Sequence, residues 1–200
     1  MAFGDNDREA VSDRARILVV AATERELAPA DGWRTWCLGV GPVEAAVATA
    51  AAIAEQRPAA ILHVGIGGSR RRPALIPPAL VIGTEAIYCD VEASNRWTPR
   101  ALTPSPVLFE AARRVLPGVV TLVIGTTARV GGSRDCDVEA MEGFSVLRVA
   151  QLAGIPAIEI RAISNEIDEP NRTRWHFEEA FAAITAVTPA LVAEFARCVS

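Results

Sequence analysis

The run from Ile17 to Ala22, ILVVAA, is the feature that most restricts what this chain can fold into. It is wholly apolar and rich in β-branched side chains, and it is too short for an average helix. Such a run is typical of a β-strand that is buried on both faces. Strands of this kind occur mainly in sheets with helices packed on both sides, so the run already favours an α/β fold.

The rest of the chain alternates between strand-like and helix-like patterns. We expect further strands over 34–40, 59–64, 80–88, 119–124 and 157–163, and helices over 43–55, 106–115, 141–152 and 175–199. Thr23 can cap a short helix, and Pro42 suits the first turn of another. Two hundred residues are enough for one domain with a sizeable core. The sequence therefore predicts a single α/β domain.

Charge and composition exclude several classes of function. The net charge is −4 and the pI is about 5.3, which argues against a surface for nucleic acid or an anionic membrane. No stretch approaches 18 uninterrupted apolar residues, so we expect no membrane span. The twenty basic residues are all Arg, which removes Schiff-base and P-loop lysine chemistry.

The cysteines indicate the cellular compartment, and the first residues indicate where the domain begins. The four cysteines are scattered without a CxxC pair, and there are two distant histidines. We therefore expect reduced, mostly buried thiols, a cytoplasmic location, no metal and no cofactor. Residues 1–16 are polar and lack the pattern of a signal peptide, so we expect a flexible N-terminal arm before a domain over 17–200.

Unusual residues gather where predicted strands end, in TERE, GVGP, GIGGS and ISNE. Ligands bind at strand ends in α/β sheets. The glycines of Gly65-Ile66-Gly67-Gly68 would let the backbone approach a ligand closely, although such a run is more often only a tight turn. It lacks the GxGxxG spacing and the downstream acid of a dinucleotide site.

Two groups of acids permit a structural or a chemical interpretation. Asp137, Glu139 and Glu142 lie at an expected helix start, where they would complement the helix dipole, or where a carboxylate could accept both hydroxyls of a vicinal diol. Glu24 and Glu26 would lie on a solvated helix face or form an acid/base pair at a cleft.

Five segments in order carry a family resemblance: ILVVAATERE, GVGPVEAA, HVGIGGS, DVEAMEG and EIRAISNEI. With them the chain resembles the purine nucleoside phosphorylase and nucleosidase superfamily from Ile17 to about Trp175. Within it, the chain is similar to the methylthioadenosine/S-adenosylhomocysteine nucleosidases and the futalosine hydrolases. The ISN form followed by NRxRW looks more like futalosine hydrolase. The resemblance implies a mixed central β-sheet flanked by helices and a homo-oligomer, a dimer or larger.

The resemblance also implies roles for individual positions. Glu26 would activate the hydrolytic water, with Glu24 as a neighbouring acid, and Asn165 would act at the purine. The implied contacts to the nucleoside are Val40 at the 5′ side, the backbone of Ile66, Gly67 and Gly68, Val130 at the base, Met141 and Glu142 at the ribose, and Ser164 at the purine. Where the nucleosidases have Glu-Met-Glu, this chain has Ala140-Met141-Glu142, so one ribose-side acid is absent or replaced by Glu139.

The choice between water and phosphate depends on cations. In hexameric phosphorylases an Arg precedes the glycine turn and a Ser lies within it; here these places hold His63 and Ile66. His63 is expected to be a packed core histidine. Arg70, Arg71 and Arg72 could supply a different phosphate clamp, although such a run is more often solvated. The sequence therefore favours hydrolysis over transfer to phosphate.

The expected function is hydrolysis of the N-glycosidic bond of a 5′-modified purine nucleoside, most simply futalosine. An Asn amide both donates and accepts hydrogen bonds, so Asn165 suits a 6-oxopurine such as the hypoxanthine of futalosine. The alternatives are a methylthioadenosine/S-adenosylhomocysteine nucleosidase, a purine nucleoside phosphorylase and a relative that binds nucleosides without catalysis.

Overall fold

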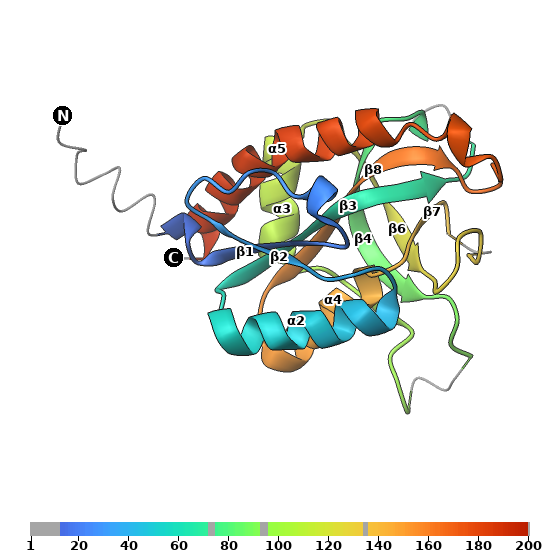
Figure 1. Cartoon of the computed structure of the whole chain (residues 1–200). Helices are drawn as coiled ribbons and strands as arrows, with labels where there is room; N and C mark the ends of the chain where they lie inside the picture. Colours follow the sequence, from blue (N-terminus) through green and yellow to red (C-terminus); the bar gives the residue numbers. More distant parts are fainter. Residues whose placement is uncertain (1–12, 72–74, 93–95, 134–135, 200) are drawn as a thin grey trace.

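The structure is a computed structural model that describes residues 13–71, 75–92, 96–133 and 136–199 (Figure 1). Most of the expected arm, residues 1–12, lies outside the described residues. Residues 13–16 contact the domain, since Ala59 N donates to Arg16 O at 2.8 Å. The strands are β1 Ile17–Ala21, β2 Arg34–Cys37, β3 Ala60–Ser69, β4 Leu80–Tyr88, β5 Ala101–Leu102, β6 Val120–Thr126, β7 Val138–Ala140 and β8 Ala157–Glu166. The helices are η1 Glu24–Glu26, α2 Pro42–Gln56, α3 Pro106–Val115, α4 Gly143–Ala153, η3 Arg172–Arg174 and α5 Phe177–Cys198.

The eight strands form one mixed sheet. β2, β1, β3 and β8 are parallel neighbours, and β8 then pairs antiparallel with β4. β4 continues to β6 and β6 to β7, both parallel, and β7 returns antiparallel to the end of β3. Five strands therefore pair in a closed ring, β3-β8-β4-β6-β7, with β1 and β2 extending from it. The expected single α/β domain with a mixed sheet and flanking helices is confirmed.

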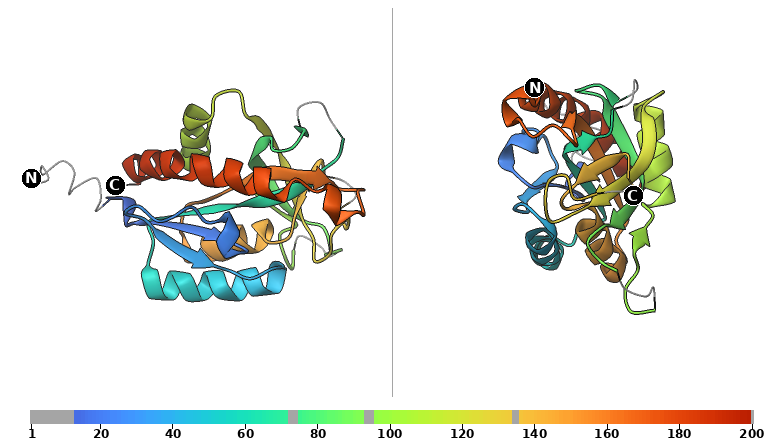
Figure 2. Two further views of the ribbon diagram at one scale, coloured as in Figure 1. Left: turned by 45° about the horizontal axis from the view of Figure 1, so that its top comes forward. Right: turned by 90° about the vertical axis from the view of Figure 1, so that its right-hand side faces the viewer.

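Helices cover the sheet on both sides, with α3 and α5 on one face and α2 and α4 on the other (Figures 1 and 2). Alternate residues of β1 point to these two layers. Ile17 and Val19 belong to the core with α3 and α5, whereas Leu18 and Val20 belong to the core with α2 and α4. The apolar run that opened the sequence is thus buried on both faces, as its composition predicts.

The glycine segment and the Ser164-Asn165 pair differ from expectation, because both lie inside strands. We expected strands to end at Val64 and Ile163, but β3 continues to Ser69 and β8 to Glu166. The two strands pair along their whole length, with a bulge at which Gly67 faces Ile163 and Gly68 faces Asn165. Ser164 is the extra residue of this bulge, and the backbone hydrogen bonds of the pair extend the strands.

Other boundaries shift locally. The second strand ends at Cys37 and not at Val40, and the expected helix start around Asp137 to Glu139 is the strand β7. The following helix begins at Gly143 instead of Met141, with Glu142 as its N-cap residue. The cysteines are free as expected, but only Cys136 is buried, so the expectation that most are buried is wrong.

The last helix, α5, is the one helix of the described residues that is long and apolar enough to cross a membrane by length and composition alone. Its inward side belongs to the core with β1, β3 and α3, and its buried residues include Ile184, Leu191 and Phe195. Glu178 and Glu194 lie on its outer side. This is the arrangement of a core helix in a soluble domain.

Candidate active site

A cavity of about 310 Å³ lies where β1, β3, β7 and β8 meet the loops that follow them. All ten residues that the sequence singled out line it: Glu26, Val40, Ile66, Gly67, Gly68, Val130, Met141, Glu142, Ser164 and Asn165. They come from six separate segments, so the fold brings the predicted residues together at one place. Sequence reasoning missed the wall formed by Arg172, Trp175, Phe177 and Phe181.

Glu26 is fixed by both of its carboxylate oxygens. Oε2 accepts hydrogen bonds from Thr23 N and Thr23 Oγ1, each at 2.8 Å, which forms the capping box of η1. Oε1 accepts from Ile66 N at 3.0 Å. The side chain is only 4% exposed, yet it lines the cavity. Its orientation is therefore set before any ligand arrives.

Glu142 lies across the cavity and is also held from two sides. Oε1 accepts from Gly41 N at 3.0 Å, and Oε2 accepts from Arg161 Nη2 at 3.4 Å. Burial raises the pKa of this carboxyl above its usual range, while Arg161 and the Gly41 amide act in the opposite direction. Since one oxygen has only a long contact, the carboxylate keeps acceptor capacity for a ligand hydroxyl.

Arg161 is the buried charge beneath the site, and its side chain is 1% exposed. Its guanidinium donates to Glu159 Oε1 at 2.8 Å and contacts Glu142 and the imidazole of His63, at 3.0 Å from Nε2. Gly65 makes room for it, because a Cβ there would lie 2.0 Å from Arg161 Nη1 and 2.9 Å from Glu26 Oε1. A glycine at this position thus admits both the cation and the carboxylate.

His63 is buried, as expected of a core histidine, but its neighbour is the Arg161 guanidinium. Burial and the charge of Arg161 hold the pKa of His63 well below its usual range, so the imidazole is neutral at pH 7. Glu159 and Arg161 were not among the predicted residues. Their signal was present, since two opposite charges alternate inside the apolar run AIEIRAI.

Ser164 and Asn165 present a hydroxyl and an amide at the strand bulge. Asn165 Oδ1 accepts from Ser164 Oγ at 2.7 Å, and its Nδ2 donates to Glu166 O at 2.9 Å. Because an amide has two N–H groups and two lone pairs, Asn165 retains one donor and one acceptor after these contacts. It can therefore hydrogen-bond a ligand edge that both accepts and donates.

The remaining acid, Glu139, is committed to a loop. Its two oxygens accept hydrogen bonds from Gly131 N and Ser133 N, each at 2.6 Å. These bonds shape the loop that carries Val130 into the cavity. The carboxylate supports the wall of the site, which leaves Glu142 as the acid better placed to bind a diol.

Of the arginines after β3, the two that the structure describes, Arg70 and Arg71, do not form a clamp over the cavity. Arg70 donates to Cys136 O and Ser133 O, and Arg71 pairs with Glu166 at 2.9 Å. Neither residue lines the cavity. Arg72, the third member of the predicted alternative clamp, lies outside the described residues.

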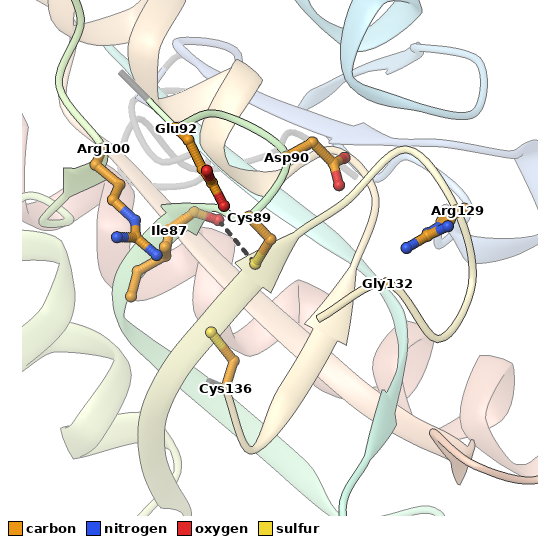
Figure 3. A pocket seen from close by; sticks show the side chains of 8 residues that line it. All are labelled: Ile87, Cys89, Asp90, Glu92, Arg100, Arg129, Gly132 and Cys136. Carbon is orange, nitrogen blue, oxygen red and sulfur yellow. Dashed lines mark hydrogen bonds between the residues drawn. The ribbon is translucent and has the colours of Figure 1, made fainter. Parts of the chain in front are cut away.

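A second cavity, of about 560 Å³, is lined in part by Arg129 and Gly132, from the loop that also carries Val130 (Figure 3). Its lining mixes Arg100 and Arg129 with Asp90 and Glu92, and none of the predicted site residues contributes to it. The Asp90 carboxylate accepts from Thr127 Oγ1 and Ala128 N, so it holds the loop. The smaller cavity therefore remains the candidate active site.

Comparison with known proteins shows the family to which the chain belongs. Residues 32–197 match the model of the phosphorylase superfamily. The chain belongs to this superfamily. It is also 34% identical, over 180 residues, to the futalosine hydrolase of Streptomyces coelicolor, an alignment that covers 78% of this chain and 76% of the relative.

Solved structures with the same fold include a futalosine hydrolase and a nucleosidase. A futalosine hydrolase mutant of Helicobacter pylori has a TM-score of 0.79 at 19% identity, covering 89% of this chain and 98% of the other. The 5′-methylthioadenosine/S-adenosylhomocysteine nucleosidase of Neisseria meningitidis, in complex with methylthio-immucillin-A, has a TM-score of 0.72 at 22% identity, with coverages of 89% and 96%. At these identities the likeness establishes the fold.

Proposed function

We propose that this protein is a nucleosidase that hydrolyses the N-glycosidic bond of futalosine and releases hypoxanthine. The observation that carries the proposal is the placement of Glu26, Glu142 and Asn165 around one cavity, each held by hydrogen bonds from the protein. These three groups meet the separate needs of the sugar, the attacking water and the departing base.

Cleavage of an N-glycosidic bond passes through a ribosyl cation and a departing purine. In the proposed reaction, Glu26 accepts a proton from a water molecule as its oxygen attacks C1′. The C1′–N9 bond breaks, and its electron pair leaves with the purine, which takes up a proton from solvent, while Glu26 later releases the proton of the attacking water to solvent. Glu142 accepts hydrogen bonds from the ribose hydroxyls, and its negative charge stabilises the cation.

Water is the acceptor that the side chains favour. Transfer to phosphate needs a cationic clamp, and the two described arginines after β3 are engaged with the loop and with Glu166. Arg161 is buried among carboxylates, so its charge is already balanced. Hydrolysis needs no such clamp.

Futalosine is the substrate that two observations favour over an adenine nucleoside. One is the identity with the Streptomyces coelicolor futalosine hydrolase. The other is Asn165, whose one free donor and one free acceptor complement the adjacent O6 and N1–H of hypoxanthine. Hydrolysis of futalosine would place the protein in menaquinone biosynthesis.

We also propose a cytoplasmic homo-oligomer. Val40, Val43 and Val47 are between 55% and 71% exposed and lie together at the start of α2, next to the cavity. A second copy that covers them would bury apolar surface and narrow the opening of the site. Light scattering of the purified protein measures the assembly directly.

Release of free base from a panel of nucleosides tests the proposal. Futalosine, methylthioadenosine, adenosylhomocysteine and inosine are each incubated with the protein, with and without phosphate. We expect the fastest release from futalosine and no effect of phosphate. Phosphate-dependent release would identify a phosphorylase, and binding without release from any nucleoside would identify a non-catalytic relative.

A further inference from the structure

The aromatic wall of the cavity also contains a positive charge, Arg172, that pairs with no carboxylate of the described residues. Arg172 of η3 lines the cavity, and its guanidinium lies 5.5 Å from the centre of the Trp175 ring. Within the described part of the chain it forms no ion pair with a carboxylate. The charge is therefore available to a ligand in the cavity.

Two neighbouring arginines differ in this respect. Arg25 lies 4.5 Å from the centre of the Phe181 ring but is paired with Glu178. Arg174 is paired with Glu169 at 3.2 Å and does not line the cavity. Of these three cations, only Arg172 combines a place on the cavity wall with an unmatched charge.

The segment that presents Arg172 is anchored to the strand beside the site. His176 N donates to Ser164 O at 2.7 Å, and Trp175 Nε1 donates to Glu169 O at 3.0 Å. Asn171 caps η3 by accepting from Thr173 N at 3.0 Å. Because the backbone and the indole are held in this way, the guanidinium is supported by a fixed aromatic surface.

We propose that Arg172 binds a carboxylate on the 5′ substituent of the nucleoside, and that Trp175, Phe177 and Phe181 pack against an apolar or aromatic part of the same substituent. The planar guanidinium matches the two oxygens of a carboxylate. The three rings provide the apolar surface beside it, which suits an aryl carboxylate better than a strongly hydrated phosphate. This inference rests on the proposed function and adds a determinant of substrate class.

The test compares two inosine derivatives that differ only at the end of an aromatic 5′ substituent, which carries a carboxylate in one and a primary carboxamide in the other. The ratio of their kcat/KM values isolates recognition of the charge. We expect the wild type to favour the carboxylate by about tenfold, the strength of a partly exposed charge-assisted hydrogen bond. The preference should appear in KM and decrease as salt is added.

Arg172→Gln should lower this ratio to near one, and Arg172→Lys should retain part of it, because the charge remains without the planar fork. Arg174→Gln is the matched control: it removes an arginine from the same short helix but not from the cavity, and should leave the ratio as in the wild type. An unchanged ratio in Arg172→Gln would overturn the proposal.

The outcome is separable from that of the proposed function. If no nucleoside is hydrolysed, the nucleosidase proposal fails, and the dissociation constants of the same two compounds then test Arg172 by calorimetry. A preference for the carboxylate that disappears in Arg172→Gln supports the proposal in that case. Equal affinities, or no binding of either compound, overturn it.

Discussion

Arg161 Nε donates to Glu159 Oε1 across 2.8 Å, and the two side chains are only 1% and 2% exposed. Burial raises the pKa of the Glu159 carboxyl, and the charge of Arg161 acts against that shift. Each charge makes burial of the other tolerable, because an isolated ion in the core would lose its hydration without compensation. The pair thus fixes the cation that contacts Glu142.

Glu159→Gln should destabilise the fold, because it leaves Arg161 buried without its closest carboxylate. We expect the free energy of unfolding to fall by about 3–5 kcal/mol, as for other buried ion pairs that lose one partner. Urea denaturation at pH 7 measures it. Glu194→Gln is the control, since Glu194 pairs with Arg114 at 2.9 Å on the surface. The free energy of unfolding of this variant should fall much less. Equal losses would contradict the account.

The stability of the protein should depend on His63 below about pH 6.5. In the unfolded chain, His63 takes up a proton as the pH falls through its usual value of 6.5, whereas burial and Arg161 hold the folded pKa well below that value. The unfolded state then binds more protons than the folded state. The free energy of unfolding therefore decreases as the pH is lowered, by up to about 1.4 kcal/mol per pH unit.

His63→Gln should remove this part of the pH dependence of the free energy of unfolding, whatever the substitution does to stability at pH 7. Urea denaturation from pH 5 to pH 8 gives the slope for each protein. The second histidine of the chain, His176, is exposed, so His176→Gln should retain the wild-type slope. The account fails here if His63→Gln retains that slope as well.

Glu26→Gln should strongly reduce turnover but preserve nucleoside binding, because a neutral amide cannot take the proton of the attacking water. We expect kcat to fall by about 10²–10⁴-fold, the usual worth of general base assistance. Glu24→Gln is the neighbouring control, as Glu24 is exposed and does not line the cavity. An active Glu26→Gln with an inactive Glu24→Gln would transfer the role to Glu24.

Glu142→Gln should weaken recognition of the ribose hydroxyls. The wild type should have a higher kcat/KM for inosine than for 3′-deoxyinosine. In the variant the ratio of these two values should be about 10- to 100-fold smaller, since hydrogen bonds to a charged group are the strong ones. Glu139→Gln should keep the preference, because its carboxylate accepts from Gly131 N and Ser133 N. The opposite pattern would assign the diol to Glu139.

Asn165→Asp should shift the preference from hypoxanthine towards adenine nucleosides. A protonated carboxyl can donate to N7 of adenine, whereas the amide complements a 6-oxopurine. The ratio of kcat/KM for inosine and adenosine measures the shift. If this ratio stays the same, Asn165 serves only the bulge, where it already contacts Ser164 and Glu166.

Much of the fold, and the ten site residues that line the cavity, could be predicted from the sequence, because local patterns encode them. The apolar run of β1 reports burial on two faces, and Pro42 and Pro106 mark helix starts where the structure has them. The strand ends predicted at Val64 and Ile163 were wrong, because the glycines and the serine that follow are held in the strands by pairing between β3 and β8. Such long-range pairing leaves no local signal.

Arg161 and Trp175 were not predicted as site residues for a similar reason. Arg161 acts on the site through contacts with Glu142 and His63, which lie far from it in the chain. Trp175 resembles any aromatic residue near a helix start until the backbone bond from His176 to Ser164 brings that segment to the cavity. Residues that reach a site through tertiary contacts are not visible in spacing alone.

The products formed from futalosine test the central claim most directly. The purified protein is incubated with futalosine in buffer with and without phosphate, and both products are identified by mass spectrometry. The account predicts hypoxanthine and the free sugar in equal amounts under both conditions, and formation of both at least about a hundredfold slower with Glu26→Gln. A sugar 1-phosphate that forms only with phosphate, or intact futalosine after prolonged incubation, would contradict it.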